Sequence, residues 1–486
     1  MFQHADYDFT LASGGRIFFV GIGGISMSGL AEIARHDGYA VAGSDRNLTP
    51  RTDHLVRQGI AVRAGHDAAW IDQFRPDLVV YTAAVHDDNP ELTRAREQGI
   101  RTISRAAFLG WLNRHFQQII NISGTHGKTT TTALCALILI ESGIDPTVHL
   151  GAELAEFHGT IRLGQPSGVM VSEACEYMRS FLQFYSTTAA ILNIDYDHVD
   201  CYSNLDAVIG AFAEFADHLP DNGVLVVPAF DLNIREMLRQ LHIRRQQAGR
   251  MMPRICRFGA ESDLTDGQKP DFYYSDLAYH QGMPEFSIWH DSRLYCRQKL
   301  QIPGCHNMLN SLAAVACASF SGGTAEAAAK ALAAYQGAEG RFTLTGEYRG
   351  AQVIADYAHH PSAVRATLAA AAHLPHRHTW VVFQPLTYSR TRILLDDFAA
   401  ALKGCEKVIL AEIYSDRETN LHDISSRDLA ERINNLGGHA VFAESFSKIR
   451  SYLDLVVQQG DLILVLGPED IRNFADQLTG RINPLI

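Results

Sequence analysis

The chain lacks the marks of several large classes of protein. Its N-terminal sequence, MFQHADYDFTLASGG, has no basic segment followed by an apolar run, so we predict no secretory signal. The apolar run 133–140 is far too short to span a membrane. The eight cysteines include no C-x-x-C pair, which favours reduced thiols over a disulfide framework or a zinc site. These absences predict a cytoplasmic protein with no membrane insertion.

Basic side chains are fewer than acidic ones. Lys and Arg number 42 against 54 Asp and Glu, which gives a formal net charge of −12. Such a chain lacks the basic surface that duplex nucleic acid attracts, so we predict no nucleic-acid partner. An anionic small molecule stays possible, because local loops and metal ions decide its binding. The length of 486 residues, at about 150 residues per domain, predicts three domains.

Strands alternate with helices along most of the chain, which is typical of parallel α/β sheets. We predict a doubly wound α/β domain over residues 1–117, a central domain with a phosphate loop over 118–337, and a third α/β domain over 338–486. Within the central domain, residues 244–270 look irregular and residues 272–300 predict antiparallel hairpins. Ala-rich helices between 307 and 335 close that domain.

The strongest single motif is a shortened P-loop. An apolar strand runs into Gly124-Thr125-His126-Gly127-Lys128-Thr129-Thr130 and then into a helix. Backbone amides in such a turn, with the helix N-terminus, form an anion hole for phosphates. Lys128 would neutralise phosphate charge, and the hydroxyl of Thr129 or Thr130 would bind Mg²⁺. The alternative is a chance Gly-Lys-Thr turn, since Ile122 stands where the full motif has its first glycine.

A second glycine-rich turn follows the first strand. It reads Gly21-Ile22-Gly23-Gly24, with Ser26 where a dinucleotide fingerprint has its last glycine, and Asp45 ends the second strand. These residues alone leave three readings open: an NAD site, a site for another nucleotide diphosphate, and a tight turn with no ligand.

Acidic and polar clusters follow several later strands, where ligands bind in open α/β sheets. Glu173 and His198 stand at two strand ends beside the P-loop and are candidates to bind Mg²⁺, against the alternatives of solvated loop charge and a packing histidine. His306, Asn307 and Asn310 open a helix, where they could either cap it or recognise adenine. In the third domain, Asp356-Tyr-Ala-His359-His-Pro and the segment around Arg390 follow successive strands. An Arg there could hold a substrate carboxylate, although a helix cap with a surface Arg is the alternative.

Taken in order, these motifs resemble the Mur ligases over essentially the whole chain. The resemblance implies a Rossmann-like N-terminal domain, a P-loop ATPase central domain and a Rossmann-like C-terminal domain. It also implies an ATP-dependent amide ligase of peptidoglycan precursor synthesis, with ATP and Mg²⁺ as cofactors. The implied reaction joins L-alanine to the carboxylate of UDP-N-acetylmuramate through an acyl phosphate.

The resemblance further assigns site residues by ligand. Lys128, His198, Asp356 and His359 would be catalytic, with His198 or His359 as the base for the amine. Amino-acid binding falls to His359 and Arg390, and metal binding to Thr129, Glu173 and His198. The UDP-sugar set is Gly21, Ile22, Gly23, Gly24, Ser26, Asp45 and Thr82. The ATP set is Gly124, Thr125, His126, Gly127, Lys128, Thr129, Thr130, His306, Asn307, Asn310, Arg341 and Asp356.

Three other functions compete with this one. A muropeptide-recycling ligase would add a tripeptide to the same UDP-sugar and needs a roomier pocket for the amine. An NAD-dependent oxidoreductase depends on the first glycine turn, and a nucleotide switch without enzyme activity depends on the P-loop alone.

Overall fold

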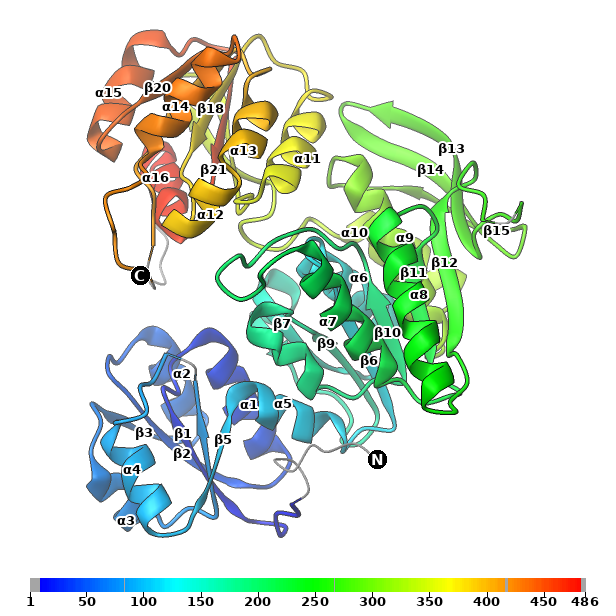
Figure 1. Cartoon of the computed structure of the whole chain (residues 1–486), viewed down its shortest axis with the longest axis vertical. Coiled ribbons are helices and arrows are strands. Elements are labelled where there is room, and N and C mark those ends of the chain that lie inside the picture. Colours follow the sequence, from blue (N-terminus) through cyan, green and yellow to red (C-terminus); the bar gives the residue numbers. More distant parts are fainter. Residues whose placement is uncertain (1–8, 83, 266, 416–417, 482–486) are drawn as a thin grey trace.

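Three α/β domains, each built on one sheet, make up the computed structural model. It describes residues 9–82, 84–265, 267–415 and 418–481. Figure 1 shows the N-terminal domain (blue) and the C-terminal domain (yellow to red) at separate places against the central domain. Of the helices within these ranges, none is both long and apolar enough to cross a membrane. All eight cysteines are free thiols.

The N-terminal sheet has five parallel strands in the order β3-β2-β1-β4-β5, which confirms the doubly wound prediction. The strand order reverses at β1, where β2 and β4 flank it, and the first glycine turn lies at this switch point. Its elements are β1 (Arg16–Val20), α1 (Ile25–His36), β2 (Ala40–Asp45), α2 (Pro50–Arg57), β3 (Ala61–Ala64), α3 (Ala68–Phe74), β4 (Leu78–Tyr81), α4 (Pro90–Glu97), β5 (Arg101–Ser104) and α5 (Arg105–Asn113).

The central sheet has ten strands in the order β15-β14-β13-β12-β11-β10-β6-β9-β7-β8. Its helical elements are α6 (Lys128–Glu141), η1 (Ala155–Phe157), η2 (Tyr177–Gln183), α7 (Leu205–Asp217), α8 (Leu232–Gln247), α9 (Cys305–Ser319) and α10 (Ala325–Ala334). Its strands are β6 (Gln118–Ser123), β7 (Thr147–Leu154), β8 (Gly159–Arg162), β9 (Val169–Glu173), β10 (Thr188–Ile191), β11 (Val224–Pro228), β12 (Arg254–Ala260), β13 (Phe272–His280), β14 (Met283–His290) and β15 (Arg293–Lys299).

Two expectations for this domain have different outcomes. The antiparallel hairpins predicted over 272–300 are confirmed as β13, β14 and β15. The irregular structure expected over 244–270 is wrong, because α8 extends to Gln247 and residues 254–260 form β12. Cys256 and Phe258 of β12 are buried in the core, but Arg254 and Arg257 in the same strand mask its hydrophobic pattern.

The C-terminal sheet has six strands in the order β16-β17-β21-β18-β19-β20, and the antiparallel edge strand β16 was not predicted. The strands are β16 (Thr343–Tyr348), β17 (Ala351–Asp356), β18 (Thr379–Phe383), β19 (Lys407–Leu410), β20 (Ala440–Phe442) and β21 (Leu462–Leu466). The helices are α11 (Pro361–Ala371), α12 (Tyr388–Ile393), α13 (Leu395–Leu402), α14 (Ser426–Asn435), α15 (Phe446–Val456) and α16 (Glu469–Thr479).

The central domain contacts its two neighbours in different ways. One buried apolar cluster runs from the N-terminal domain, with Phe19 and Phe108, into the central domain, with Phe181 and Phe215. The C-terminal domain instead meets the central domain largely through polar and ring contacts, such as Tyr279 stacked on His373 with ring centroids 4.2 Å apart. The exact boundaries at 117/118 and 337/338 stay predictions.

Candidate active site

The P-loop lies between β6 and α6. Gly127 has a left-handed φ of 86°, and a Cβ there would come within 2.4 Å of Asn310 Oδ1, so this position requires glycine. Lys128 begins α6, and its Nζ donates hydrogen bonds to Gly124 O at 2.6 Å and Thr125 O at 3.2 Å. The ammonium group therefore lies over the loop that the sequence assigns to phosphates.

A buried carboxylate holds this lysine in place. Glu176 is 2% exposed and lies 2.8 Å from Lys128 Nζ and 3.4 Å from His198 Nε2. Burial alone would raise the pKa of Glu176, but the Lys128 charge and the His198 hydrogen bond lower it overall. Burial alone would lower the pKa of Lys128, and Glu176 raises it overall. Both groups are therefore ionised near neutral pH, beside the predicted phosphate loop.

The predicted metal residues come from three places around the P-loop. Glu173, at the end of β9, accepts a hydrogen bond from Gly151 N at 2.6 Å, and the nearby Thr129 hydroxyl opposes the rise in its pKa. Burial raises the pKa of Glu173. His198 has a left-handed φ of 50°, and its buried Nδ1 has no hydrogen-bond partner within the described part of the chain. Oxygen ligands such as those of Thr129 and Glu173 suit Mg²⁺.

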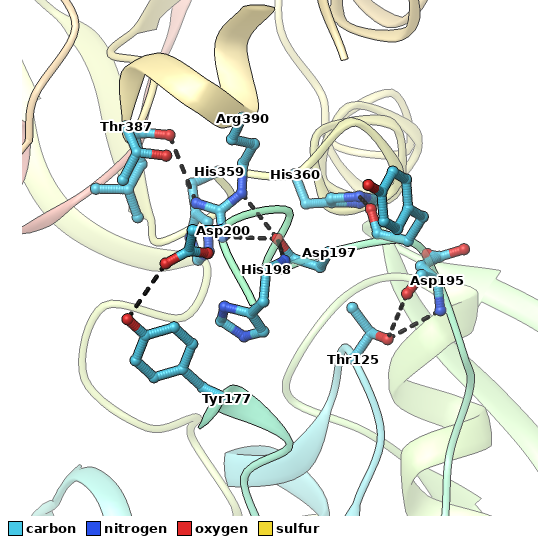
Figure 2. Close-up of polar contacts among 12 residues, drawn as sticks. Thr125, Tyr177, Asp195, Asp197, His198, Asp200, His359, His360, Thr387 and Arg390 are labelled. Atoms are coloured by element: carbon cyan, nitrogen blue, oxygen red, sulfur yellow. Dashed lines mark hydrogen bonds and ion pairs between the residues drawn. The ribbon is translucent and has the colours of Figure 1, made fainter. Parts of the chain in front are cut away.

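An ion pair joins the central and C-terminal domains beside this centre (Figure 2). Arg390 of α12 donates from Nε to Asp197 Oδ1 at 2.8 Å, and its Nη2 lies 2.6 Å from the same oxygen. The side chains are 2% and 7% exposed. Burial alone would raise the pKa of Asp197, but the Arg390 charge holds it well below its usual range. Arg390, which we predicted to bind the amino acid, thus forms an ion pair with Asp197 of the central domain.

His359 lies next to this pair in the C-terminal domain (Figure 2). Its Nδ1 lies 2.7 Å from Tyr357 O, so Nδ1 carries the proton and donates to that carbonyl. Burial and the neighbouring Arg390 charge hold the pKa of His359 well below its usual range. The ring is therefore neutral, and Nε2 carries no proton.

A second contact between these domains involves two histidines. The rings of His126 and His360 lie 4.9 Å apart, and His126 Nε2 is 3.0 Å from Asp195 Oδ2. The side-chain atoms of His126, Asp195 and His360 that could bind a metal lie within 4.8 Å of one another. Within the described ranges, no other group of three such residues is this close. However, His360 is already bonded to Tyr196 O and Ser362 N, and His126 to Asp195. The cluster is therefore a hydrogen-bonded domain contact.

The residues assigned to adenine lie next to the P-loop. The N-cap of α9 is Gly304, with no side-chain hydrogen bond, so the alternative that His306, Asn307 or Asn310 caps this helix is wrong. Asn307 Nδ2 instead donates to Pro303 O at 2.7 Å, and Asn310 Nδ2 donates to Asn307 Oδ1 at 3.2 Å. Burial lowers the pKa of His306 to about 4, so this ring is neutral. Their role in adenine recognition stays a prediction.

Arg341 and Asp356 lie together at the start of the C-terminal domain. The guanidinium of Arg341 stacks over the Tyr357 ring, 4.8 Å from its centroid. Asp356 ends β17 and accepts a hydrogen bond from the Thr367 hydroxyl. Burial raises the pKa of Asp356, while Thr367 and the Arg341 charge oppose that shift.

The first glycine turn is built by close contacts. Gly21 has a left-handed φ of 81°, and a Cβ there would lie 2.7 Å from Thr82 Cγ2. Gly23 N donates to Asp45 Oδ2 at 2.8 Å, so this carboxylate supports the turn. Ser26 lies in the first turn of α1 and bonds His149 of β7 and Arg105 of α5.

Sequence reasoning missed both partners of Ser26. Arg105 follows the carboxyl end of β5, as Thr82 follows β4, and this shared position is a signal that could have found it. His149 lies inside a buried strand, and only the packing of β7 against α1 brings it to the turn. Glu176 lies three residues after Glu173, but nothing in the sequence distinguishes it from its neighbours.

Family models match all three domains. The Mur ligase family catalytic domain matches residues 16–117, the Mur ligase middle domain 122–318, and the Mur ligase glutamate ligase domain 340–468. The chain belongs to the Mur ligase family. Its predicted fold class is thereby confirmed, as is its prediction as an ATP-dependent ligase.

Named relatives resemble this Mur ligase over nearly its full length. The UDP-N-acetylmuramate–L-alanine ligase of Acetivibrio thermocellus is 40% identical, covering 94% of this chain and 93% of the relative. The ligase of the same name from Lachnospira eligens is also 40% identical, covering 95% and 97%. The solved UDP-N-acetylmuramate-alanine ligase of Thermotoga maritima has a TM-score of 0.74 at 28% identity, covering 96% and 98%. The murein peptide ligase of Psychrobacter arcticus has a TM-score of 0.67 at 25% identity, covering 97% and 100%.

Proposed function

We propose that this Mur ligase joins L-alanine to UDP-N-acetylmuramate with ATP. A carboxylate oxygen of the sugar's lactyl group attacks the γ-phosphorus of ATP, and the bond to the β-phosphate oxygen breaks to release ADP. The alanine nitrogen then attacks the acyl carbon, loses a proton to a base, and expels inorganic phosphate to leave an amide. The observation that carries this proposal is the near-full-length identity of about 40% to ligases that bear this name.

The charges around the P-loop support the first step. Lys128 is fixed by Glu176 and by two loop carbonyls, so its ammonium is held in place before the phosphates arrive. A preorganised cation stabilises the charge that develops on a transferring phosphoryl group without having to reorient. Removal of Lys128 would therefore affect phosphoryl transfer more than binding of the UDP-sugar.

Mg²⁺ fits the residues at the end of β9. Thr129 and Glu173 offer oxygen ligands beside Lys128. His198, whose Nδ1 has no partner among the described residues, shares the carboxylate of Glu176 with Lys128. We propose that Thr129, Glu173 and His198 hold the ion, which when bound would neutralise charge on the ATP phosphates. These three residues do not determine how many Mg²⁺ ions bind.

The second step needs a neutral amine and a group that accepts its proton. His359 fits this role because its ring is neutral, with an unprotonated Nε2 that can accept a proton, and because it lies beside Arg390. His198 is the less suitable base, since its Nε2 already faces Glu176. We propose His359 as the base, with Arg390 and Asp197 setting the position of its loop against the central domain.

A murein peptide ligase is the second candidate, because the P. arcticus enzyme of that name covers 97% of this chain. The NAD-dependent alternative loses its basis, because Mur ligase models match all three domains. A cytoplasmic location follows from the proposed substrates and agrees with eight free thiols, three of them buried.

One assay tests the proposal against its rivals. Phosphate release from ATP and UDP-N-acetylmuramate is measured with L-alanine, with the tripeptide L-alanyl-γ-D-glutamyl-meso-diaminopimelate, and with no amine. The proposal expects release that depends on L-alanine. Release only with the tripeptide would assign the recycling reaction instead, and release with neither amine would remove the ligase proposal altogether.

A further inference from the structure

Two tight turns beside the P-loop contain residues with a left-handed backbone. In η2, Met178 and Arg179 have φ of 51° and 55°, and in the segment that follows β10, His198 has φ of 50°. Residues with a Cβ adopt this conformation only where surrounding contacts hold them in it. Met178 is 64% exposed, so burial of its own side chain does not hold the first turn. Contacts made by its neighbours must do so.

Tyr177 joins the two turns. Its ring centroid lies 4.8 Å from that of His198, and its hydroxyl donates to Asp200 Oδ2 at 3.2 Å (Figure 2). A second, buried tyrosine supports the same arrangement, because the Tyr202 hydroxyl donates to Glu176 O at 2.7 Å. The first turn is thus fixed to the second by one ring contact and two hydrogen bonds.

The two ring nitrogens of His198 have different surroundings. Nε2 lies 3.4 Å from Glu176 Oε1, whereas Nδ1 is buried without a hydrogen-bond partner in the described part of the chain. Because Glu176 is ionised, its carboxylate favours the tautomer that carries the hydrogen on Nε2, and Nδ1 then keeps its lone pair. Histidines that bind a metal have this arrangement, with the nitrogen opposite the metal donating to a carboxylate.

We propose that Tyr177 is a positioning residue for His198. Its ring, held by Asp200, keeps the imidazole turned toward Glu176, so that Nδ1 is the nitrogen left for the ion of the ATP site. His198 belongs to no helix or strand, so side-chain contacts rather than a regular element fix the orientation of its ring. Without the Tyr177 ring, the imidazole can rotate away from Glu176. This inference rests on the Mg²⁺ site of the proposed function.

Calorimetric titration of the full-length protein with ADP tests this role. Each titration is run once with Mn²⁺ and once with EDTA, which separates the metal-dependent part of ADP binding from the rest. Tyr177→Leu removes the ring and should raise the Kd with Mn²⁺ by a factor of about 10 to 100, the usual cost of losing a residue that orients a metal ligand. The Kd with EDTA should not change. Tyr177→Phe keeps the ring but not the bond to Asp200, so it should raise the Kd with Mn²⁺ by less.

Two comparisons separate positioning from a general loss of structure. Tyr295→Leu is the matched control, because Tyr295 is also half-buried and its ring lies 6.1 Å from that of His290, but on β15 at the edge of the central sheet. This variant should bind ADP like the wild type with Mn²⁺ and with EDTA. In a His198→Asn background, Tyr177→Leu should add little further loss, because a residue that acts through His198 has nothing left to position.

Several results would overturn the inference. They are an unchanged Kd in Tyr177→Leu, equal losses with Mn²⁺ and with EDTA, and an undiminished further loss in the His198→Asn background. If Tyr177→Leu melts well below the wild type, Tyr177→Phe decides: a rise in Kd with Mn²⁺ alone supports the inference, and an unchanged Kd rejects it. A wild-type protein that binds ADP no more tightly with Mn²⁺ than with EDTA would instead reject the metal site of the proposed function.

Discussion

The ion pair between Asp197 and Arg390 makes a quantitative prediction about domain docking. Both side chains are almost fully buried, and they come from different domains. Replacing Asp197 by Ala leaves the guanidinium buried without a counter-charge whenever the domains are docked. If the domains separate, Arg390 can return to water, so the variant should favour the separated arrangement.

The expected size follows from the burial of the pair. Removing one partner of a buried ion pair costs about 3–5 kcal/mol. At about 1.4 kcal/mol for each factor of ten, the docked arrangement should lose roughly 100- to 4,000-fold in its equilibrium constant. A matched control is Asp423→Ala, which removes the partner of Arg392 on the same helix α12. That pair is 43% and 45% exposed, so its loss should cost about 0–1 kcal/mol.

The loss of domain docking can be measured by small-angle X-ray scattering and by enzyme turnover. Asp197→Ala should increase the radius of gyration and reduce kcat, whereas Asp423→Ala should change neither. The double variant Asp197→Leu with Arg390→Met removes both charges and should restore the compact scattering curve, although turnover should stay low if Arg390 also places the amino acid. Wild-type scattering and turnover in Asp197→Ala would refute the reasoning, because the pair would then contribute nothing to docking.

The remaining predictions concern the ATP site. Lys128→Ala should reduce turnover by at least about 1,000-fold, with UDP-sugar binding by calorimetry close to wild type; loss of both would contradict the domain roles. Glu173→Gln should raise the Mg²⁺ concentration for half-maximal activity. Because burial raises the pKa of Glu173, wild-type Mg²⁺ affinity should fall as pH drops, beginning at a higher pH than an ordinary glutamate would give. Gly127→Ala should abolish ATP binding through its clash with Asn310, whereas Gly143→Ala, with φ of 77° and open space around it, should cost only about 1 kcal/mol of stability.

The sequence predicted those site residues whose position depends on neighbouring residues in the chain. The turn around Gly127 joins a buried strand to a helix, and that order of elements is legible in the sequence. The same is true of Glu173 at its strand end. The contact of Asp197 with Arg390 is different, because 193 residues separate the partners and only the docking of two domains brings them together.

Two misreadings have different physical causes. The strand β12 carries Arg254 and Arg257 among its apolar residues, so its pattern resembles a loop until the neighbouring strands cover it. Asn307 is a good N-cap by type, but it lies inside α9, where its amide donates to the carbonyl of Pro303. For β12 the sheet pairing overrode the local pattern, whereas at Asn307 a nearby carbonyl competed with the cap.

The apolar cluster shared by the first two domains has a consequence for how the chain unfolds. Residues such as Phe108 and Phe181 lose their burial if either domain melts, so the two sheets should denature as one cooperative unit. The third domain has clusters of its own around Phe383 and Ile463 and shares few apolar contacts with the rest. A calorimetric scan should therefore resolve two heat-absorption peaks for a protein with three sheets.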